Sequence, residues 1–171
     1  MIDFPCKQAT CRLGVISDTH GLLRAEAIEL LQGVDLIIHA GDIGPPEILE
    51  TLQAIAPVTA VRGNMDRGQL GEILPEKESI QIGGILIHVL HDLNRLKCDP
   101  QIEGFRLVIN GHTHQPLLHT VDGVMYLNPG SAGPRRFTLP VSLARVELNN
   151  ERISVRHFDL EAGTTPDRHP Q

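Results

Sequence analysis

The sequence predicts a mixed α/β sandwich of two β-sheets. In the first half of the chain, short apolar runs alternate with segments of helical spacing, a pattern typical of parallel strands joined by right-handed crossovers. In the second half, three pairs of apolar runs flank two-residue turns, which indicates antiparallel hairpins. The combination of parallel and antiparallel pairing favours a mixed sandwich.

The first half gives three strands and two helices. The run LGVIS suits a strand buried on both faces, and the leucines and alanine between residues 22 and 31 then fall near one helical face. Gly33 is placed to cap that helix, while Pro45 and Pro46 suit the first turn of the next. The expected elements are strand 13–17, helix 22–31, strand 36–39, helix 47–56 and strand 58–61.

The second half gives three hairpins and one further strand. Their turns are Gly83-Gly84, Asp122-Gly123 and Asn149-Asn150. The expected strands are 79–82 with 85–90, 106–109 alone, 117–121 with 124–127, and 141–148 with 152–156. We expect a single domain over residues 11–158, an irregular lead-in over 1–10 and a disordered tail over 159–171.

Composition restricts the class of protein. The chain has 171 residues and 41% hydrophobic content, enough for one compact domain. A formal charge of −6, four Phe, one Tyr and no Trp argue against stable nucleic-acid binding, which needs a positive groove and stacking aromatics. No apolar run is long enough for a membrane span. Three cysteines without metal-type spacing fit free thiols in a reducing compartment, so we expect a cytoplasmic protein.

Five short segments place metal-binding side chains directly after strand-type runs. In open α/β sheets, ligands bind beyond the carboxyl ends of the strands, so these loops are expected to converge on one crevice. Each segment alone is a weak signal, but five in order are not expected by chance. The segments are SDTH (Asp18, His20), AGD (Asp42), RGNMD (Asn64, Asp66), LHD (His91, Asp92) and NGHTH (His112, His114).

The donor atoms favour two divalent cations. Carboxylate oxygen together with imidazole nitrogen suits Mn²⁺, Fe²⁺, Ni²⁺, Co²⁺ or Zn²⁺ better than Ca²⁺. A tetrahedral zinc site takes only four ligands, and more candidates than that are present. Two ions about 3.5–4 Å apart can share a carboxylate and act together on a phosphate. The candidate ligands are Asp18, His20, Asp42, Asn64, His91, His112 and His114.

The same residues carry a family resemblance. The series Asp18-x-His20, Gly41-Asp42, Gly63-Asn64-x-Asp66, His91 and Gly111-His112-x-His114 resembles the signature of the calcineurin-like metallophosphoesterases. Within that superfamily, VRGNMD and NPGSAGPR (128–135) resemble the small prokaryotic phosphodiesterase subfamily, which also includes the phosphoesterase-fold subunit of retromer. The resemblance covers roughly residues 13–155. It implies a four-layer α/β/β/α sandwich, two mixed β-sheets flanked by helices.

The resemblance also implies an activity and a ligand assignment. The activity is dinuclear phosphoesterase chemistry, most of all phosphodiesterase, in which a metal-bridging hydroxide attacks phosphorus in line, with Mn²⁺ the first candidate metal. Asp42 would bridge the ions and, with Asn64, Asp66 and His112, form the catalytic group. The first ion would be held by Asp18, His20, Asp42 and His114, and the second by Asp42, Asn64, His91 and His112. The expected substrate is a small phosphate ester or phosphodiester.

The sequence leaves two other functions open. A non-catalytic scaffold of the same fold is one, although an intact ligand set argues against it. A dinuclear hydrolase of amides or thioesters is another. The sequence leaves a homodimer open as well.

The sequence departs from the family pattern at two positions. Met65 stands where the larger protein phosphatases have a His that can protonate the leaving group, and a thioether cannot do so. A gap-filling core position is the alternative interpretation of Met65. Asp92 follows His91 where Gly is usual, and His88 is a rival ligand. We favour His91 because it stands at the end of its strand, and we read Asp92 as a surface charge.

The sequence allows two interpretations of the roles of Asp66 and of the arginines at 135 and 136. Asp66 either accepts a hydrogen bond from a ligand imidazole or stabilises its own turn. Arg135 and Arg136 either bind a phosphate oxygen or lie on the surface. A hydrogen-bonded structural role is expected for His39.

Overall fold

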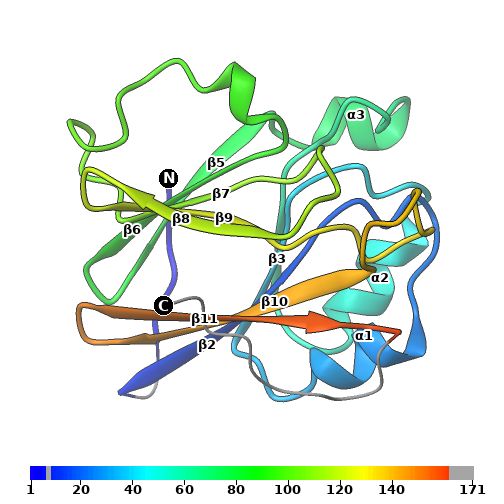
Figure 1. The fold of residues 1–171 in the computed structure, drawn as a ribbon, viewed down its shortest axis with the longest axis horizontal. Helices are drawn as coiled ribbons and strands as arrows, with labels where there is room; N and C mark the ends of the chain where they lie inside the picture. Colours follow the sequence, from blue (N-terminus) through cyan, green and yellow to red (C-terminus); the bar gives the residue numbers. More distant parts are fainter. Residues whose placement is uncertain (7–8, 162–171) are drawn as a thin grey trace.

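Two β-sheets face each other across the core of the molecule (Figure 1). The computed structural model describes residues 1–6 and 9–161. Its helices are α1 (Ala25–Leu30), α2 (Glu47–Gln53), α3 (Gln69–Ile73) and the 3₁₀ helix η1 (Leu93–Arg95). Its strands are β1 (Ile2–Asp3), β2 (Thr10–Ile16), β3 (Leu36–His39), β4 (Val58–Ala60), β5 (Lys77–Ile82), β6 (Ile85–Leu90), β7 (Leu107–Ile109), β8 (Leu117–Val121), β9 (Val124–Asn128), β10 (Ser142–Asn149) and β11 (Arg152–Asp159).

The five-stranded sheet has the order β11-β10-β2-β3-β4. Strands β2, β3 and β4 are parallel, as the alternation of strands and helices predicts. The predicted hairpin β10–β11 is antiparallel and joins the sheet through β2, where Val146 pairs with Leu13. The sheet is therefore mixed.

The six-stranded sheet has the order β1-β5-β6-β7-β9-β8. The other two predicted hairpins, β5–β6 and β8–β9, are antiparallel. Between them β7 pairs in parallel with both β6 and β9. Strands β6, β7 and β9 therefore run in the same direction, which gives this sheet a carboxyl edge of its own.

The period-two pattern of the strands separates two apolar layers. Leu13 and Val15 of β2 point between the sheets and pack with Ile87 and Ile109, whereas Ile16 of β2 faces the helices. Helices α1 and α2 cover this outer face through residues such as Leu52. On the far side, the outer face of the six-stranded sheet is covered by η1 and the loop around it, whose Leu93 and Leu96 pack against Leu90 and Val108. The predicted fold class is confirmed, with a thin fourth layer.

The ends of the chain differ from the expectation. Within the expected irregular lead-in, Ile2 and Asp3 form β1, which pairs with β5. At the other end, β11 continues to Asp159, and buried Leu160 donates its backbone N–H to Val141. Backbone pairing thus fixes Ile2 and Asp3 of the lead-in and the first residues of the tail, up to Leu160. The expected disorder over 162–171 lies outside the described residues.

The helices are shorter than the apolar patterns indicated. Helix α1 begins at Ala25 rather than at residue 22, and the extended backbone of Arg24 precedes it. The short helix α3 and η1 were not expected at all. Within the described residues, no helix is long and apolar enough to cross a membrane.

Candidate metal centre

The predicted ligands lie on loops that leave the carboxyl ends of five strands. Three of these strands, β2, β3 and β4, are parallel neighbours in one sheet, and the other two, β6 and β7, are parallel neighbours in the second sheet. The two edges meet at the site, because the backbone N–H of His112 after β7 donates to Asp18 Oδ2 after β2 at 3.2 Å. His91 after β6 likewise contacts the carbonyl oxygen of Ala40 after β3, at 2.8 Å. The site is therefore a junction of both sheets.

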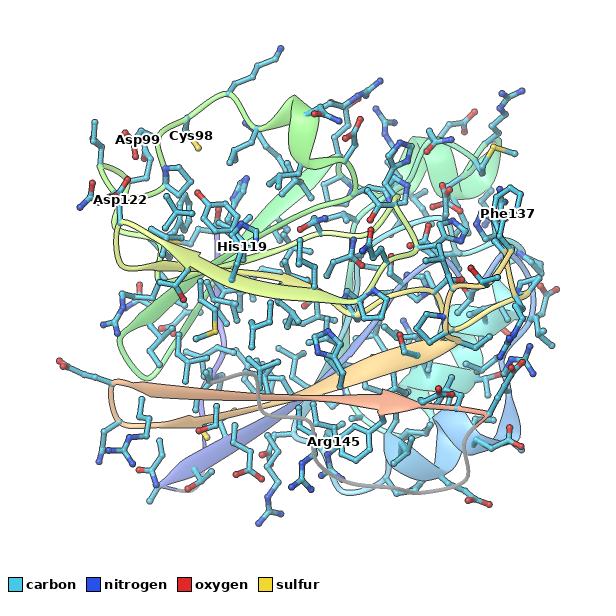
Figure 2. All side chains as sticks on the ribbon, viewed as in Figure 1. Cys98, Asp99, His119, Asp122, Phe137 and Arg145 are labelled. Atoms are coloured by element: carbon cyan, nitrogen blue, oxygen red, sulfur yellow. The ribbon has the colours of Figure 1, made fainter. Side chains whose placement is uncertain are left out.

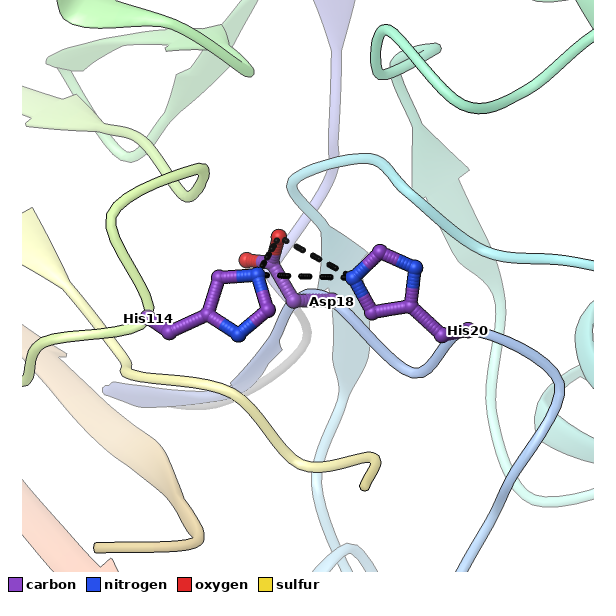
Figure 3. Close-up of side chains that lie close together, drawn as sticks. All are labelled: Asp18, His20 and His114. Atoms are coloured by element: carbon purple, nitrogen blue, oxygen red, sulfur yellow. Dashed lines mark hydrogen bonds and ion pairs between the residues drawn. The ribbon is translucent and has the colours of Figure 1, made fainter. Parts of the chain in front are cut away.

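The first group of side chains is Asp18, His20 and His114 (Figure 3). His114 Nε2 lies 3.2 Å from Asp18 Oδ1, and the two imidazole Nε2 atoms are 3.4 Å apart. His20 Nε2 lies 3.9 Å from Asp18 Oδ1. One carboxylate oxygen and two imidazole nitrogens thus point at a common position.

The second group surrounds Asp42. His91 Nε2 lies 3.4 Å from Asp42 Oδ2 and 3.2 Å from Asn64 Oδ1. His112 Nδ1 lies 3.0 Å from the same amide oxygen of Asn64. The structure therefore brings all seven predicted ligands together, and it places His91 rather than His88 beside Asp42.

The two groups share carboxylates. Asp18 belongs to both a cluster with His20 and His114 and a cluster with Asp42 and His91. Asp42 Oδ2 also faces both groups, at 3.4 Å from His91 Nε2 and 3.9 Å from His20 Nε2. The sequence-based assignment gave the bridging position to Asp42 alone. In the structure the Asp18 carboxylate also lies within reach of both groups of side chains.

Protein hydrogen bonds occupy one oxygen of each carboxylate and leave the other facing the imidazoles. Ser17 Oγ donates to Asp18 Oδ2 at 2.6 Å, and the backbone N–H of Met65 donates to Asp42 Oδ1 at 2.8 Å. Asp18 Oδ1 is buried without a hydrogen-bond partner. A buried carboxylate oxygen without a partner is costly unless a cation binds it.

The imidazole of His91 is oriented in the same way. If Nδ1 carries the proton that is donated to the carbonyl oxygen of Ala40, Nε2 holds its lone pair toward Asp42 and Asn64. A second hydrogen bond of this kind fixes the tautomer and ring orientation of histidines that bind metals. The side chain is 5% exposed, so few other orientations are open to it.

The backbone of the site is strained. Asp18, His20, Asp42, His112 and His114 all have positive φ, between 46° and 70°. Non-glycine residues seldom adopt this left-handed conformation, which costs about 1–3 kcal/mol at each position. Such residues concentrate at functional sites, and here the strain turns side chains of adjacent loops toward one another.

Glycine allows the loops to approach closely. A Cβ on Gly63 would collide with the Asp42 carboxylate and backbone, and a Cβ on Gly111 would lie 2.7 Å from Asp18 Oδ2. Gly41 combines a φ of +95° with an equally close approach to His91 Nδ1. The glycine that precedes each of Asp42, Asn64 and His112 in the sequence is therefore needed for packing.

Electrostatics favour an ionised carboxylate at the centre. Burial opposes the ionisation of Asp42, but contact with His91, which is favourable when that ring is protonated, and a hydrogen bond from the backbone N–H of Met65 outweigh it, so the pKa of Asp42 lies below its ordinary value. Burial likewise opposes protonation of His91, yet contact with Asp42 raises its pKa. For His20 burial prevails over the carboxylates, and its pKa is lowered.

Asp66 holds the loops together by backbone contacts. Its Oδ1 accepts from the N–H groups of Ile43 at 2.8 Å and Gly44 at 3.2 Å, and its Oδ2 accepts from Gly63 at 2.8 Å. Among the described residues no imidazole donates to it, so the reading of Asp66 as a partner of a ligand imidazole is wrong. Asp66 does stabilise its own turn, through the N–H of Gly63, and it also anchors the loop of Asp42, through the N–H of Ile43.

His39 has the expected structural role. Its Nδ1 accepts from the backbone N–H of Gly41 at 3.2 Å, and its Nε2 lies 3.0 Å from Thr19 Oγ1, which donates to Ile43 at 2.8 Å. The ring is fully buried, and this burial lowers the pKa of His39 to about 4. The chain of hydrogen bonds connects the loop after β2 to the loop after β3.

The structure decides the roles of three further residues near the ligand loops. Met65 is 56% exposed, so the core reading of this residue is wrong. His88 lies away from the centre, where it contacts Ser79 Oγ and the ring of Phe105. Asp92 caps η1 by accepting from the backbone N–H of Asn94 at 3.0 Å.

Neither arginine of the loop 134–136 contacts a ligand side chain. Arg135 forms an ion pair with Glu161. Arg136 is exposed, and its positive charge contributes to the lowered pKa of His20. Arg136 therefore lies near enough to the first group to act on it electrostatically.

Sequence reasoning missed the residues that position the ligands. Ser17 donates to Asp18 Oδ2, and Ser131 Oγ donates to the backbone carbonyl oxygen of Asp18 at 2.9 Å. Ser17 could have been found as the hydroxyl neighbour of a buried carboxylate. Ser131 lies far away in the sequence, and no local pattern indicates its contact.

Comparison with known proteins agrees with this geometry. The model of the calcineurin-like phosphoesterase superfamily domain matches residues 11–151. The chain belongs to this superfamily. It is 35% identical over 153 residues to a probable metallophosphoesterase of Methanothermobacter thermautotrophicus, covering 82% of this chain and 88% of that protein. It is 28% identical over 137 residues to a phosphodiesterase of Methanocaldococcus jannaschii, covering 70% and 82%.

The fold is shared with a solved structure. The Zn²⁺ complex of Vps29 from Entamoeba histolytica has a TM-score of 0.76 and 24% sequence identity, covering 90% of this chain and 94% of that one. The metallophosphoesterase fold supplies two mixed sheets with loops that meet at one edge. In the present chain those loops carry the aspartates, histidines and Asn64 described above.

The residues of the centre fit divalent cations. The unpartnered buried oxygen of Asp18 faces the Nε2 atoms of His20 and His114, and the mixed oxygen and nitrogen donors suit borderline metals. The two carboxylates of Asp18 and Asp42 would repel each other in a buried site without a cation. The donor set thus meets the requirements of a metal centre.

Proposed function

We propose that this protein is a dinuclear metal-dependent phosphoesterase that acts on small phosphodiesters. The observation that supports this most directly is the position of Asp42 Oδ2 between His20 Nε2 at 3.9 Å and His91 Nε2 at 3.4 Å. One carboxylate oxygen that faces both histidine groups is what a bridging ligand requires. The 28% identity to a phosphodiesterase supports the choice of diesters.

Each proposed ion would have its own set of side chains. Asp18, His20 and His114 would hold one, Asn64, His91 and His112 the other, and Asp42 would contact both. Two such ions lower the pKa of bound water and bind phosphate oxygens, which supplies both the nucleophile and charge stabilisation. Mn²⁺ is the first metal to test, followed by Ni²⁺, Fe²⁺, Co²⁺ and Zn²⁺.

Three side chains beside the proposed ions bear on how the substrate is oriented and how charge is stabilised. His112 is exposed at the mouth of the centre, where its ring can contact a phosphate oxygen as negative charge develops. Asn64 Oδ1 lies 3.2 Å from His91 Nε2 and 3.0 Å from His112 Nδ1, so a shared cation would join the three side chains. Met65, exposed beside Asp42, cannot give a proton to the leaving group, so we expect preference for leaving groups that depart as anions.

Turnover of bis(p-nitrophenyl) phosphate tests the proposal. The protein is freed of metal with chelator and reloaded with each divalent cation, and release of p-nitrophenolate is followed. We expect turnover that depends on metal and is at least about 100-fold lower in Asp42→Asn, with the fold retained by circular dichroism. Absence of turnover with every metal would favour a non-catalytic scaffold, and near-normal turnover of Asp42→Asn would contradict the shared-ligand assignment.

Two further assays separate the alternatives. A p-nitrophenyl amide and a thioester of matched size test the other hydrolase classes. Faster turnover of either than of the diester would overturn the phosphoesterase proposal. Metal content after dialysis should be two ions per chain in the wild type.

A further inference from the structure

A cleft of about 280 Å³ opens beside the second group of ligands. Asn64, His91 and His112 form one wall, and the rest extends away from the metal centre toward η1 and the start of β5. The volume lies near the lower end of small-molecule pockets, about 300–1,000 Å³. The cleft thus has room for part of a small substrate, directly adjacent to the candidate ligands.

Positive side chains dominate the lining of this cleft. Four cationic residues contribute to it, Arg62, Lys77, Arg95 and Lys97, against two acidic ones, Glu76 and Asp92. This excess is local, because the chain as a whole carries a formal charge of −6. A concave surface of one sign concentrates ligands of the opposite sign.

The acidic residues are already engaged. Glu76 Oε1 lies 2.9 Å from Arg62 Nη2 and 4.0 Å from Arg95 Nη1, and Asp92 accepts from the backbone and side-chain N–H groups of Asn94. Within the part of the chain that the structure describes, no ion pair involves Lys77 or Lys97. Two ammonium groups therefore remain available to a ligand.

The cleft is also held in shape by the protein. Arg62 donates to the backbone carbonyl oxygen of Gly71, which fixes its position against α3. The hydrogen bonds of Asp92 cap η1, the helix that carries Arg95. Leu90, which is 3% exposed, lines the cleft with an apolar surface. A cationic lining beside an apolar patch favours an organic group that bears an anion.

We propose that this cleft binds a second phosphate group of the substrate, held by Lys77 and Lys97, while the reacting phosphate lies at the metal centre. The inference rests on the proposed function and narrows the substrate class to small phosphoesters or phosphodiesters that carry a further phosphate on the same molecule.

Binding of phosphonates to the Mn²⁺-loaded protein tests the cleft without turnover. Methylphosphonate and the α,ω-alkane diphosphonates with one to four methylene groups are compared by isothermal titration calorimetry, with metal content measured before and after. We expect the best diphosphonate to bind about tenfold more tightly than methylphosphonate. Hydrogen bonds between its second phosphonate and the ammonium groups should increase the affinity by about this factor or more.

Variants identify the residues responsible. In the double variant Lys77→Gln/Lys97→Gln, the affinity ratio of the best diphosphonate to methylphosphonate should fall to about one. The control Arg145→Gln removes one charge from β10 in the other sheet (Figure 2) and should keep the wild-type ratio. A ratio near one in the wild type, or an unchanged ratio in the double variant, would overturn the inference.

The two proposals fail in different ways. Turnover of bis(p-nitrophenyl) phosphate together with a wild-type ratio near one would keep the phosphoesterase and remove the second phosphate site. No turnover with any metal, together with a ratio that depends on the lysines, would keep the cleft as a phosphate-binding site and remove the enzyme.

Discussion

Asp66 accepts a hydrogen bond from the backbone N–H of Ile43 at 2.8 Å, and this contact joins the turn after β4 to the loop after β3. The same carboxylate accepts from Gly63 in its own turn at 2.8 Å. Asp42 and Asn64 each stand next to one of these anchored residues. Asp66 is 7% exposed and so acts as a buried clamp between two ligand loops.

Replacement of this clamp should weaken metal binding without removing a ligand. Asp66→Ala leaves the backbone N–H groups of buried Ile43 and of the more accessible Gly44 and Gly63 without their acceptor, which we expect to cost about 1–3 kcal/mol in the free energy of unfolding. Loss of a group that positions ligands typically lowers metal affinity about 10–100-fold. Urea unfolding with chelator and calorimetric titration with Mn²⁺ measure the two effects separately.

A matched control for Asp66 is Asp99→Ala. Asp99 also accepts a backbone N–H in a turn, from Gln101 at 3.0 Å, but it is exposed in the loop after η1 (Figure 2) and contacts none of the loops that Asp66 joins. This variant should keep its Mn²⁺ affinity within about twofold. Equal loss of affinity in both variants would contradict a clamp specific to Asp66.

Gly63→Ala should remove the approach between the loops of Asp42 and Asn64. The added Cβ would collide with the Asp42 carboxylate, so one loop must move. We expect a loss of about 1–3 kcal/mol in stability, as for other overpacked sites, and a marked loss of Mn²⁺ affinity. Gly104→Ala serves as the control, because a Cβ there meets nothing within 4 Å and only the φ of +80° is unfavourable. An affinity loss as large in the control would show that the effect does not depend on the approach of the two ligand loops.

The parts of the fold that follow from local pattern were predictable. Strand β3 lies at the expected residues because four consecutive apolar or buried residues have no amphipathic alternative, and Gly83-Gly84 and Asp122-Gly123 set the turns of their hairpins. Strand β1 was not predictable, since two exposed residues form it only through pairing with β5. Its stability comes from a distant partner, which a local reading does not contain.

The same division applies to the metal centre. Side-chain types and strand-end positions identify the candidate ligands, because parallel strands bring their carboxyl ends together. The contact of His91 Nδ1 with Ala40 and the positive φ of Asp18 depend on how two sheets meet. The cationic cleft was missed for the same reason, as Arg62 and Lys97 are separated in sequence and meet only through the fold.

Met65→His should change the dependence of the rate on the leaving group. Met65 is exposed and its backbone N–H contacts Asp42, so an imidazole at this position would stand at the mouth of the metal centre. General acid catalysis typically contributes about 10²–10⁴-fold, and it matters most for poor leaving groups. We expect turnover of methyl p-nitrophenyl phosphate to change little, and release of methanol from dimethyl phosphate to rise.

The comparison is made with a series of aryl diesters whose phenols differ in pKa. In the wild type, log kcat/KM should fall steeply as the pKa of the phenol rises, and in Met65→His the fall should be shallower. Met65→Leu is the control that keeps an apolar side chain and should match the wild-type slope. A slope unaffected by Met65→His would show that this position does not reach the leaving group.

The buried ring of His39 should make stability depend on pH. Burial lowers the pKa of His39 to about 4, whereas the ordinary value in an unfolded chain is 6.5. Between these values the unfolded protein binds one more proton than the folded protein, so the free energy of unfolding falls as the pH falls from 6.5 to 4, by about 3 kcal/mol in total. Above pH 6.5 the ring is neutral in both states and contributes no slope to the free energy of unfolding.

The variant His39→Gln tests this. It can keep the contact with Thr19 but does not titrate. In urea unfolding of the metal-free proteins, the stability of the variant should therefore gain on that of the wild type as the pH falls. A stability difference that stays constant between pH 7 and 4.5 would mean that His39 titrates alike in both states.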